Sequence, residues 1–292
     1  MAETTIIITG ASGAMGSAAV KAMAREGYGI IMACRNLEKG AGVRESILRE
    51  IPDARLEVLH LDLASLASVR AFADAIAGRC AEGMVLGGLF NNAGIINRYF
   101  KVTEDGYENT MATNFIGPSV LTEALLPLFA DGGHIVSMVS LTCGMTRLGQ
   151  DFLTPRKEDF HQLRTYAKSK LALLLYSLSL SERVSGRVFV NLADPGIVNS
   201  NMISMGRWFD PLADVLFRPF CKSPENGVAP AVRALLADKH QRFFIGNPKP
   251  GSHRSGDRSI PMRYWRMLKD QGIRFCCSKF SQPAANRLFS LP

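Results

Sequence analysis

The chain opens with the stretch that decides its fold, Thr5-Ile-Ile-Ile-Thr-Gly-Ala-Ser-Gly-Ala-Met-Gly16. The β-branched run predicts a strand over 5–9, and the segment after the glycines has a helical period. Glycine lets the backbone turn tightly and approach a pyrophosphate, which then meets free N–H groups at a helix N-terminus. Such a turn can also be a plain tight connection. Its place at the first strand–helix junction favours a phosphate-binding turn made of Gly10, Ser12, Gly13, Ala14, Met15 and Gly16.

Short apolar runs alternate with helical segments along the rest of the chain. The predicted strands are 5–9, 29–34, 56–61, 85–91, 133–139, 188–192 and 242–245. The predicted helices are 14–25, 37–50, 65–77, 106–128, 163–182 and 224–237. This alternation predicts one α/β domain, a doubly wound, parallel seven-stranded sheet with helices on both faces. Such sheets bind ligands at the carboxyl ends of their strands.

Composition adds limits to this fold. The 292 residues are 47% hydrophobic, enough for one sizeable core, and no linker or repeat divides them. We expect a domain over 1–250 and a C-terminal extension over 251–292. The six cysteines show no metal-ligand spacing, so no metal site is expected. The sequence shows neither a signal-peptide pattern nor an apolar run of ~20 residues, so we expect a cytoplasmic protein.

The extension carries much of the formal net charge of +8, with basic and aromatic residues interleaved. It could form a packed terminal helix, a homo-oligomer contact, a lipid-facing surface or a nucleic-acid patch. No nucleic-acid-binding module accompanies it, so no nucleic acid is expected as a partner. Peripheral contact with a membrane remains an alternative.

Arg35 and Asn36 follow the second predicted strand, where dinucleotide-binding folds place the residue that reads the adenosine ribose. A carboxylate there would hold a 2′-hydroxyl, whereas arginine offers a planar, permanently charged group suited to a 2′-phosphate. Lys39, one helical turn later, adds charge. A solvated arginine at a strand end is the alternative. The pattern favours NADP(H) over NAD(H).

A second cluster is Tyr166-Ala-Lys-Ser-Lys170, on a strongly helical segment. Residues i and i+4 share a helix face, so the Tyr166 phenol and the Lys170 ammonium point the same way. A nearby cation is expected to lower the tyrosine pKa and so make the phenol usable as an acid or base. Ser140, just after an apolar strand, would orient a substrate oxygen. Tyrosine–lysine pairs on helices are also common by chance.

Taken together, these landmarks resemble the short-chain dehydrogenase/reductase family over about residues 4–250. The likeness implies a Rossmann-type fold. It rests on the glycine turn, Asp62 in Leu61-Asp-Leu63, Asn91-Asn-Ala93-Gly94, Asn114, Ser140, the Tyr166/Lys170 pair and Pro195-Gly196-Ile-Val198.

The resemblance implies roles for these positions. The catalytic set would be Asn114, Ser140, Tyr166 and Lys170: Tyr166 exchanges a proton with the substrate oxygen that Ser140 polarises, Lys170 holds the nicotinamide ribose, and Asn114 holds the lysine through a water. Asp62 would meet the adenine. Further cofactor contacts would come from Leu63, Asn91, Ala93, Gly94, Pro195, Gly196, Val198 and Ser200.

Within the family, the spacing is similar to that of retinol dehydrogenases, protochlorophyllide reductases and oxidoreductases with WW domains. These imply a lipophilic carbonyl or alcohol substrate of the retinoid, steroid or long-chain ketone type. Residues 201–222, rich in methionine and aromatics, would form a substrate lid, or else an ordinary packed helix.

Two positions depart from the family pattern: Ala14 replaces the second glycine of the turn, and Asp194 stands where relatives often have histidine or asparagine. The expected function is an NADP(H)-dependent oxidoreductase. The alternative is a non-catalytic NADP(H)-binding sensor or scaffold.

Overall fold

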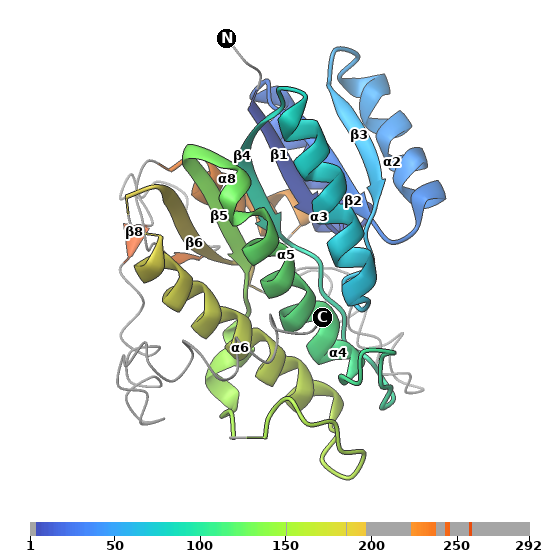
Figure 1. Cartoon of the computed structure of the whole chain (residues 1–292), viewed down its shortest axis with the longest axis vertical. Helices are drawn as coiled ribbons and strands as arrows, with labels where there is room; N and C mark the ends of the chain where they lie inside the picture. The colour runs from blue at the N-terminus through green and yellow to red at the C-terminus, as the bar shows by residue number, and fades with distance from the viewer. Residues whose placement is uncertain are drawn as a thin grey trace.

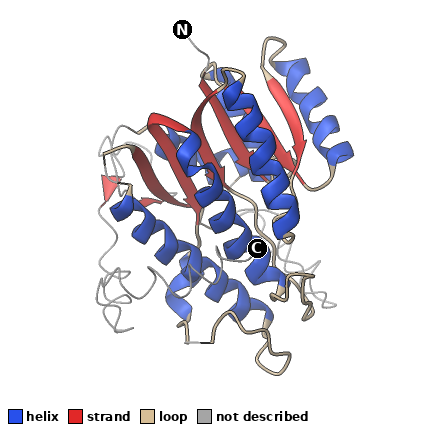
Figure 2. Ribbon diagram, viewed as in Figure 1, coloured by secondary structure: helices blue, strands red, loops and turns tan. Residues whose placement is uncertain are grey.

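A single sheet with helices on both faces forms the framework (Figures 1 and 2). The structure, a computed structural model, describes residues 4–149, 151–184, 186–196, 223–237, 243–245 and 257–258. The strands are β1 Thr4–Thr9, β2 Gly29–Cys34, β3 Leu56–His60, β4 Val85–Asn91, β5 Phe129–Met138, β6 Val188–Asp194, β7 Phe243–Ile245 and β8 Asp257–Arg258. Their order is β3-β2-β1-β4-β5-β6-β7-β8.

The helices follow the predicted alternation. They are α1 Ala14–Arg25, α2 Leu37–Glu50, α3 Leu66–Ala81, α4 Asn109–Met111, α5 Gly117–Leu125, α6 Gln162–Arg183 and α8 Pro224–Leu235. A π-helical turn, η1 (Ala112–Ile116), joins α4 to α5, and the 3-10 turns η2 (Leu126–Leu128) and η3 (Leu141–Met145) flank β5. No helix in the described part of the chain is long and apolar enough to cross a membrane.

Strand β1 shows why the sheet needs helices on both faces. Ile7 packs into one core with α3, α5 and α6, whereas Ile6 and Ile8 pack into a second core with α1, α2 and α8. All three isoleucines are buried, because a parallel sheet of this type is apolar on both faces. β1 pairs with β2 on one side and β4 on the other, which places the topological switch point at its carboxyl end.

The predicted fold class is confirmed, with differences at the edges. β1 to β7 are parallel, and the two-residue β8 adds an antiparallel strand from the predicted extension. The predicted helix over 106–128 begins only at Asn109, because Gly106 has a φ of +83° and Glu108 caps the backbone N–H of Met111 at 2.9 Å. The predicted lid at 201–222 and the rest of the extension lie outside the described residues.

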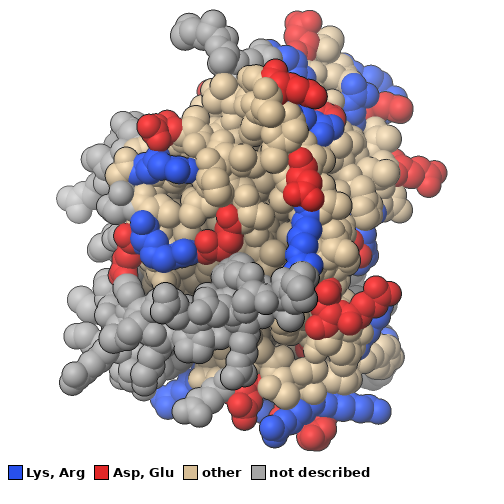
Figure 3. Space-filling view, in the orientation of Figure 1, with Lys and Arg blue, Asp and Glu red and all other residues tan. Residues whose placement is uncertain are grey.

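The described surface carries both signs of charge. On the face shown in Figure 3, Lys and Arg side chains are interspersed with Asp and Glu and do not gather into one patch. Ion pairs on the described surface as a whole include Lys21 with Glu50 at 2.6 Å and Arg79 with Glu57 at 2.5 Å. Exposed pairs of this kind contribute little to stability.

Candidate active site

A groove of about 640 Å³ opens at the carboxyl ends of β1, β2 and β4. This is the switch point of the sheet, where the fold is expected to bind its ligand. The groove is lined by Gly10, Ser12, Gly13, Ala14, Met15, Gly16, Ala33, Arg35, Asn36, Lys39, Leu61, Asp62, Leu63, Asn92, Ala93, Gly94, Ile95, Ile96, Asn97 and Thr113. Twelve of the predicted cofactor residues therefore lie around one cavity.

The glycine turn forms one wall of this groove. Gly10 has a φ of +64°, a conformation that L side chains rarely adopt. A Cβ at Gly16 would lie 2.2 Å from the carbonyl oxygen of Gly10, so helix α1 can start this close to β1 only with glycine there. Ala14 is the first residue of α1 and its side chain is exposed. The turn thus presents the start of a helix to the groove, as a pyrophosphate site requires.

Thr9 and Asn92, two residues that the sequence reasoning did not assign to the site, hold this wall against β4. The hydroxyl of Thr9 accepts hydrogen bonds from the backbone N–H groups of Asn92 and Ala93, both at 3.0 Å. The Asn92 amide donates in return to the Thr9 carbonyl at 2.8 Å. Asn91 was predicted to line the cofactor, but its amide donates to Thr122 at 3.0 Å and it is not among the groove-lining residues.

Two basic side chains, Arg35 and Lys39, line the groove at the end of β2. Asn36 caps helix α2, since its side-chain oxygen accepts from the backbone N–H of Lys39 at 2.7 Å. The described groove lining also contains one carboxylate, that of Asp62, which follows β3. Asp62 accepts from the backbone N–H of Ala64 at 2.9 Å, which fixes its turn. The β2 end therefore offers two cations to an anionic ligand group.

Ser140, Tyr166 and Lys170 meet where β5 ends and α6 begins. The Tyr166 hydroxyl is hydrogen-bonded to Ser140, whose oxygen also accepts from the backbone N–H of Thr142 at 3.3 Å. Lys170 is 2% exposed, and its ammonium donates to the Met138 carbonyl at 2.8 Å. The lysine nitrogen lies 5.9 Å from the centre of the Tyr166 ring. The predicted pair therefore does share a face of α6, with Ser140 against the phenol.

The pKa values of this cluster differ from the sequence expectation. Burial raises the pKa of Tyr166 to about 12, although the hydrogen bond to Ser140 opposes that rise. Burial also lowers the pKa of Lys170 to about 8. Desolvation is the largest cause of the Tyr166 shift, so the expected lowering of the tyrosine pKa by Lys170 is wrong.

Asn114 lies in the π-helical turn η1 and is fully buried. Its amide donates to the Ile95 carbonyl at 2.9 Å and to the Ser169 hydroxyl at 3.0 Å. Ser169 in turn donates to the Tyr166 carbonyl at 2.7 Å. Ser169 is thus a further residue that the sequence reasoning missed, although it lies inside the Tyr166–Lys170 motif. It joins Asn114 to the helix that carries the tyrosine.

Gly94 connects the groove to this cluster. A Cβ at Gly94 would lie 3.3 Å from the Lys170 nitrogen and 3.6 Å from the Asn114 side-chain oxygen. Gly94 also lines the groove, so the buried lysine stands directly behind the groove wall. Pro195 and Gly196 follow β6 at the same edge of the sheet, whereas Val198 and Ser200 lie outside the described residues.

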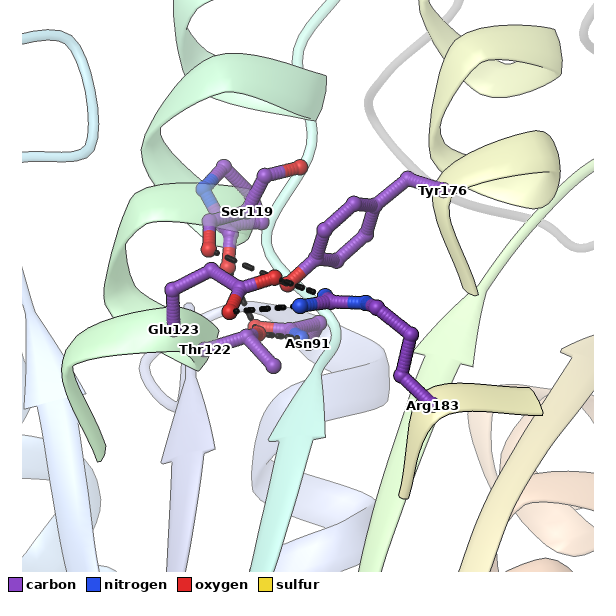
Figure 4. A network of polar contacts seen from close by, with 7 residues as sticks. Asn91, Ser119, Thr122, Glu123, Tyr176 and Arg183 are labelled. Carbon is purple, nitrogen blue, oxygen red and sulfur yellow. Dashed lines mark hydrogen bonds and ion pairs between the residues drawn. The ribbon is translucent and has the colours of Figure 1, made fainter. Parts of the chain in front are cut away.

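A partly buried network of polar side chains ties α5 to α6 further along the helix (Figure 4). The Tyr176 hydroxyl donates to Glu123 at 2.9 Å, and Arg183 forms an ion pair with the same carboxylate. Burial, followed by the charge of Glu123, raises the pKa of Tyr176 well above its usual value. Tyr176 is therefore a neutral donor, and the network fixes the helix that carries Tyr166 and Lys170.

Known proteins share both the sequence pattern and the fold. A family model for short chain dehydrogenases matches residues 4–207. Human retinol dehydrogenase 13 is 31% identical over 89% of this chain and 82% of its own length. Mouse polyprenol dehydrogenase is 35% identical over 79% of this chain and 71% of its own length. The crystal structure of an uncharacterised protein from Mycobacterium paratuberculosis superposes with a TM-score of 0.68 at 26% identity, covering 92% of this chain and 93% of that one. The chain belongs to the short-chain dehydrogenase family.

Proposed function

We propose that the protein is an NADP(H)-dependent oxidoreductase that transfers a hydride between the nicotinamide and a carbonyl or alcohol carbon of a lipophilic substrate. The observation that carries this proposal is the cluster of Ser140, Tyr166 and Lys170 beside a groove of dinucleotide size. A sensor or scaffold of the same fold would not require all three side chains in contact.

The groove fits a phosphorylated dinucleotide on its own geometry. The glycine turn leaves no room for a Cβ at position 16, so backbone N–H groups can approach a pyrophosphate closely. Arg35 and Lys39 would hold the 2′-phosphate, and Asp62 would lie at the adenine end. When bound, NADPH supplies the hydride.

The protein's own side chains manage the proton. During carbonyl reduction negative charge develops on the substrate oxygen, which Ser140 would stabilise by a hydrogen bond. Tyr166 would donate its proton to that oxygen; with a pKa of about 12 the phenol is fully protonated at neutral pH. Lys170 would hold the nicotinamide ribose from its place behind Gly94. Asn114 would fix this end of the groove through Ile95 and Ser169.

The surroundings of Ser140 support a lipophilic substrate. Leu141 and Met145 in η3 are 40% and 80% exposed, and Leu163, just before Tyr166 on α6, is 46% exposed. Exposed apolar side chains thus lie on the two elements next to Ser140 and Tyr166, where a substrate with an extended hydrocarbon part could pack against them. The names of the retinol and polyprenol dehydrogenases point to the same class of alcohols. A cytoplasmic location, a homo-oligomer and peripheral membrane contact through the basic extension remain predictions.

The decisive experiment measures NADPH consumption by the purified full chain with a panel of hydrophobic ketones and aldehydes. We expect turnover of at least one of them in the wild type, and its loss in Tyr166→Phe with NADPH binding retained. Tight NADPH binding without turnover of any member in either direction would favour the sensor or scaffold.

A further inference from the structure

Asp194 is a buried carboxylate that the mechanism above does not use. It is the last residue of β6 and is 1% exposed. Its neighbour Ala193 pairs with Met138 in the sheet and accepts a hydrogen bond from the backbone N–H of Val139 at 2.9 Å. Asp194 therefore ends its strand beside the strand end that carries Ser140, and beside the Met138 carbonyl that binds Lys170.

One task of this side chain is to shape the turn that follows. The Asp194 carboxylate accepts from the backbone N–H of Gly196 at 2.8 Å, and Gly196 has a φ of +72°. A side chain that bonds the backbone two residues later stabilises such turns. Asparagine could accept the same hydrogen bond, so the turn alone does not require a charge here.

The charge acts on the catalytic cluster. Burial is the largest cause of the pKa shifts of three neighbouring groups: it raises the pKa of Tyr166 and Cys143 and lowers that of Lys170. The Asp194 carboxylate adds a smaller effect, which raises the pKa of each of the three. Burial raises the pKa of the Cys143 thiol to about 12, so this thiol is neutral near pH 7. Cys143 and Asp194 are the two described side chains whose charge affects the pKa of Lys170. Because the thiol is neutral near pH 7, Asp194 is the one that carries a negative charge there. A buried ammonium is costly unless an opposite charge lies near it.

We propose that Asp194 is a positioning residue of the active site, whose carboxylate fixes the Pro195–Gly196 turn and balances the charge of the buried Lys170 ammonium. The catalytic half of this inference rests on the proposed function, whereas the charge balance is a property of the fold. Near neutral pH the carboxylate keeps Lys170 protonated, and so able to donate to the Met138 carbonyl and to a ribose hydroxyl.

A double-mutant cycle tests the charge balance without any substrate. Urea unfolding is measured for the wild type, Asp194→Asn, Lys170→Met and the double variant at pH 7 and pH 10. Asparagine keeps the acceptor for Gly196, so Asp194→Asn retains the turn. At pH 7 it should reduce the folding equilibrium constant of the wild type about fivefold, the effect at this pH of a fall of one unit from a Lys170 pKa of about 8. In the Lys170→Met background the loss should vanish, and at pH 10 it should shrink in the wild type as Lys170 loses its proton. Equal losses in both backgrounds at both pH values would overturn the proposal.

The pH profile of turnover tests the catalytic half. In the wild type, activity should fall at alkaline pH as Lys170 deprotonates; Asp194→Asn should move that limb to lower pH by roughly half a unit or more. Asp194→Ala, which also loses the bond to Gly196, should be less stable than Asp194→Asn. An unmoved alkaline limb would overturn the catalytic role. If the wild type turns over no carbonyl, the proposed function fails, yet the unfolding cycle still decides whether Asp194 balances Lys170.

Discussion

The two ends of the groove are built in different ways. At the glycine turn the backbone makes the site: Gly10 takes a positive φ, and Gly16 leaves no space for a Cβ beside the Gly10 carbonyl. At the catalytic end side chains make it: the half-buried Tyr166 and the buried Lys170 and Asp194 interact in a desolvated cluster. The comparison teaches that mutations at the glycine turn should impair cofactor binding through steric clashes. Mutations at the catalytic end should instead change protonation states, and with them the pH dependence of stability and turnover.

The largest effect is expected at the catalytic end. Tyr166→Phe removes only the hydroxyl, so the fold and NADPH binding should survive while turnover falls by ~10² or more. Steady-state kinetics on a substrate found in the carbonyl panel, with NADPH binding measured by fluorescence, check this. Near wild-type turnover with chemistry rate-limiting would show that Tyr166 is not the proton donor.

A second prediction concerns pH and uses no substrate. The folded pKa of Lys170, about 8, lies below its ordinary value of 10.5, so the unfolded chain binds more protons between these pH values. The contribution of Lys170 to stability should therefore rise with pH across this window, by roughly 3 kcal/mol in all. The Cys143 thiol opposes this rise above pH 9, because its folded pKa of about 12 exceeds the ordinary 9.0. Below pH 8 Lys170 is protonated in both the folded and the unfolded chain, so the free-energy cost of burying its ammonium does not change with pH.

Lys170→Met should flatten that rise, as seen in urea midpoints between pH 7 and 10. Above this pH range, ionisation of Tyr166 should lower the stability again. Its folded pKa of about 12 exceeds the ordinary 10.0, so stability from the protonated phenol is present below pH 10 and is lost as pH rises toward 12. A rise that persists unchanged in Lys170→Met would contradict the low pKa of this lysine.

The sequence predicts the backbone-built end of the groove better than the catalytic end, which is built from side chains. The strand–helix alternation and the glycine spacing predicted the sheet and the groove lining, because backbone geometry depends on local residue types. The tyrosine pKa was expected to be low, yet burial raises it, since desolvation depends on tertiary packing that no local pattern records. Thr9, Asn92 and Ser169 were missed because their hydrogen-bond partners are distant in the sequence or are backbone atoms.

A third prediction moves to the other end of the groove. Arg35 replaces the carboxylate that would hold a ribose 2′-hydroxyl, so NADPH should bind at least about tenfold more tightly than NADH. Arg35→Asp should reverse the preference, because a carboxylate repels the 2′-phosphate and accepts from the hydroxyl. Titration calorimetry with both cofactors measures it. Lys39→Ala serves as the matched control and should reduce the preference without reversing it.

The smallest effect is expected at Ala14, where the chain departs from the family's glycine pattern. Its side chain is exposed at the start of α1, so its methyl group does not press on the backbone of the turn. Ala14→Gly should therefore change the NADPH dissociation constant by no more than about threefold, or less than about 0.7 kcal/mol. Gly16→Ala is the steric counterpart, since its Cβ would lie 2.2 Å from the Gly10 carbonyl oxygen and must displace the turn. It should weaken NADPH binding far more than Ala14→Gly, although each variant changes a single methyl group. If instead Ala14→Gly tightened binding tenfold and Gly16→Ala were neutral, the pyrophosphate would approach α1 at residue 14, and the close contact at Gly16 would not shape the phosphate site.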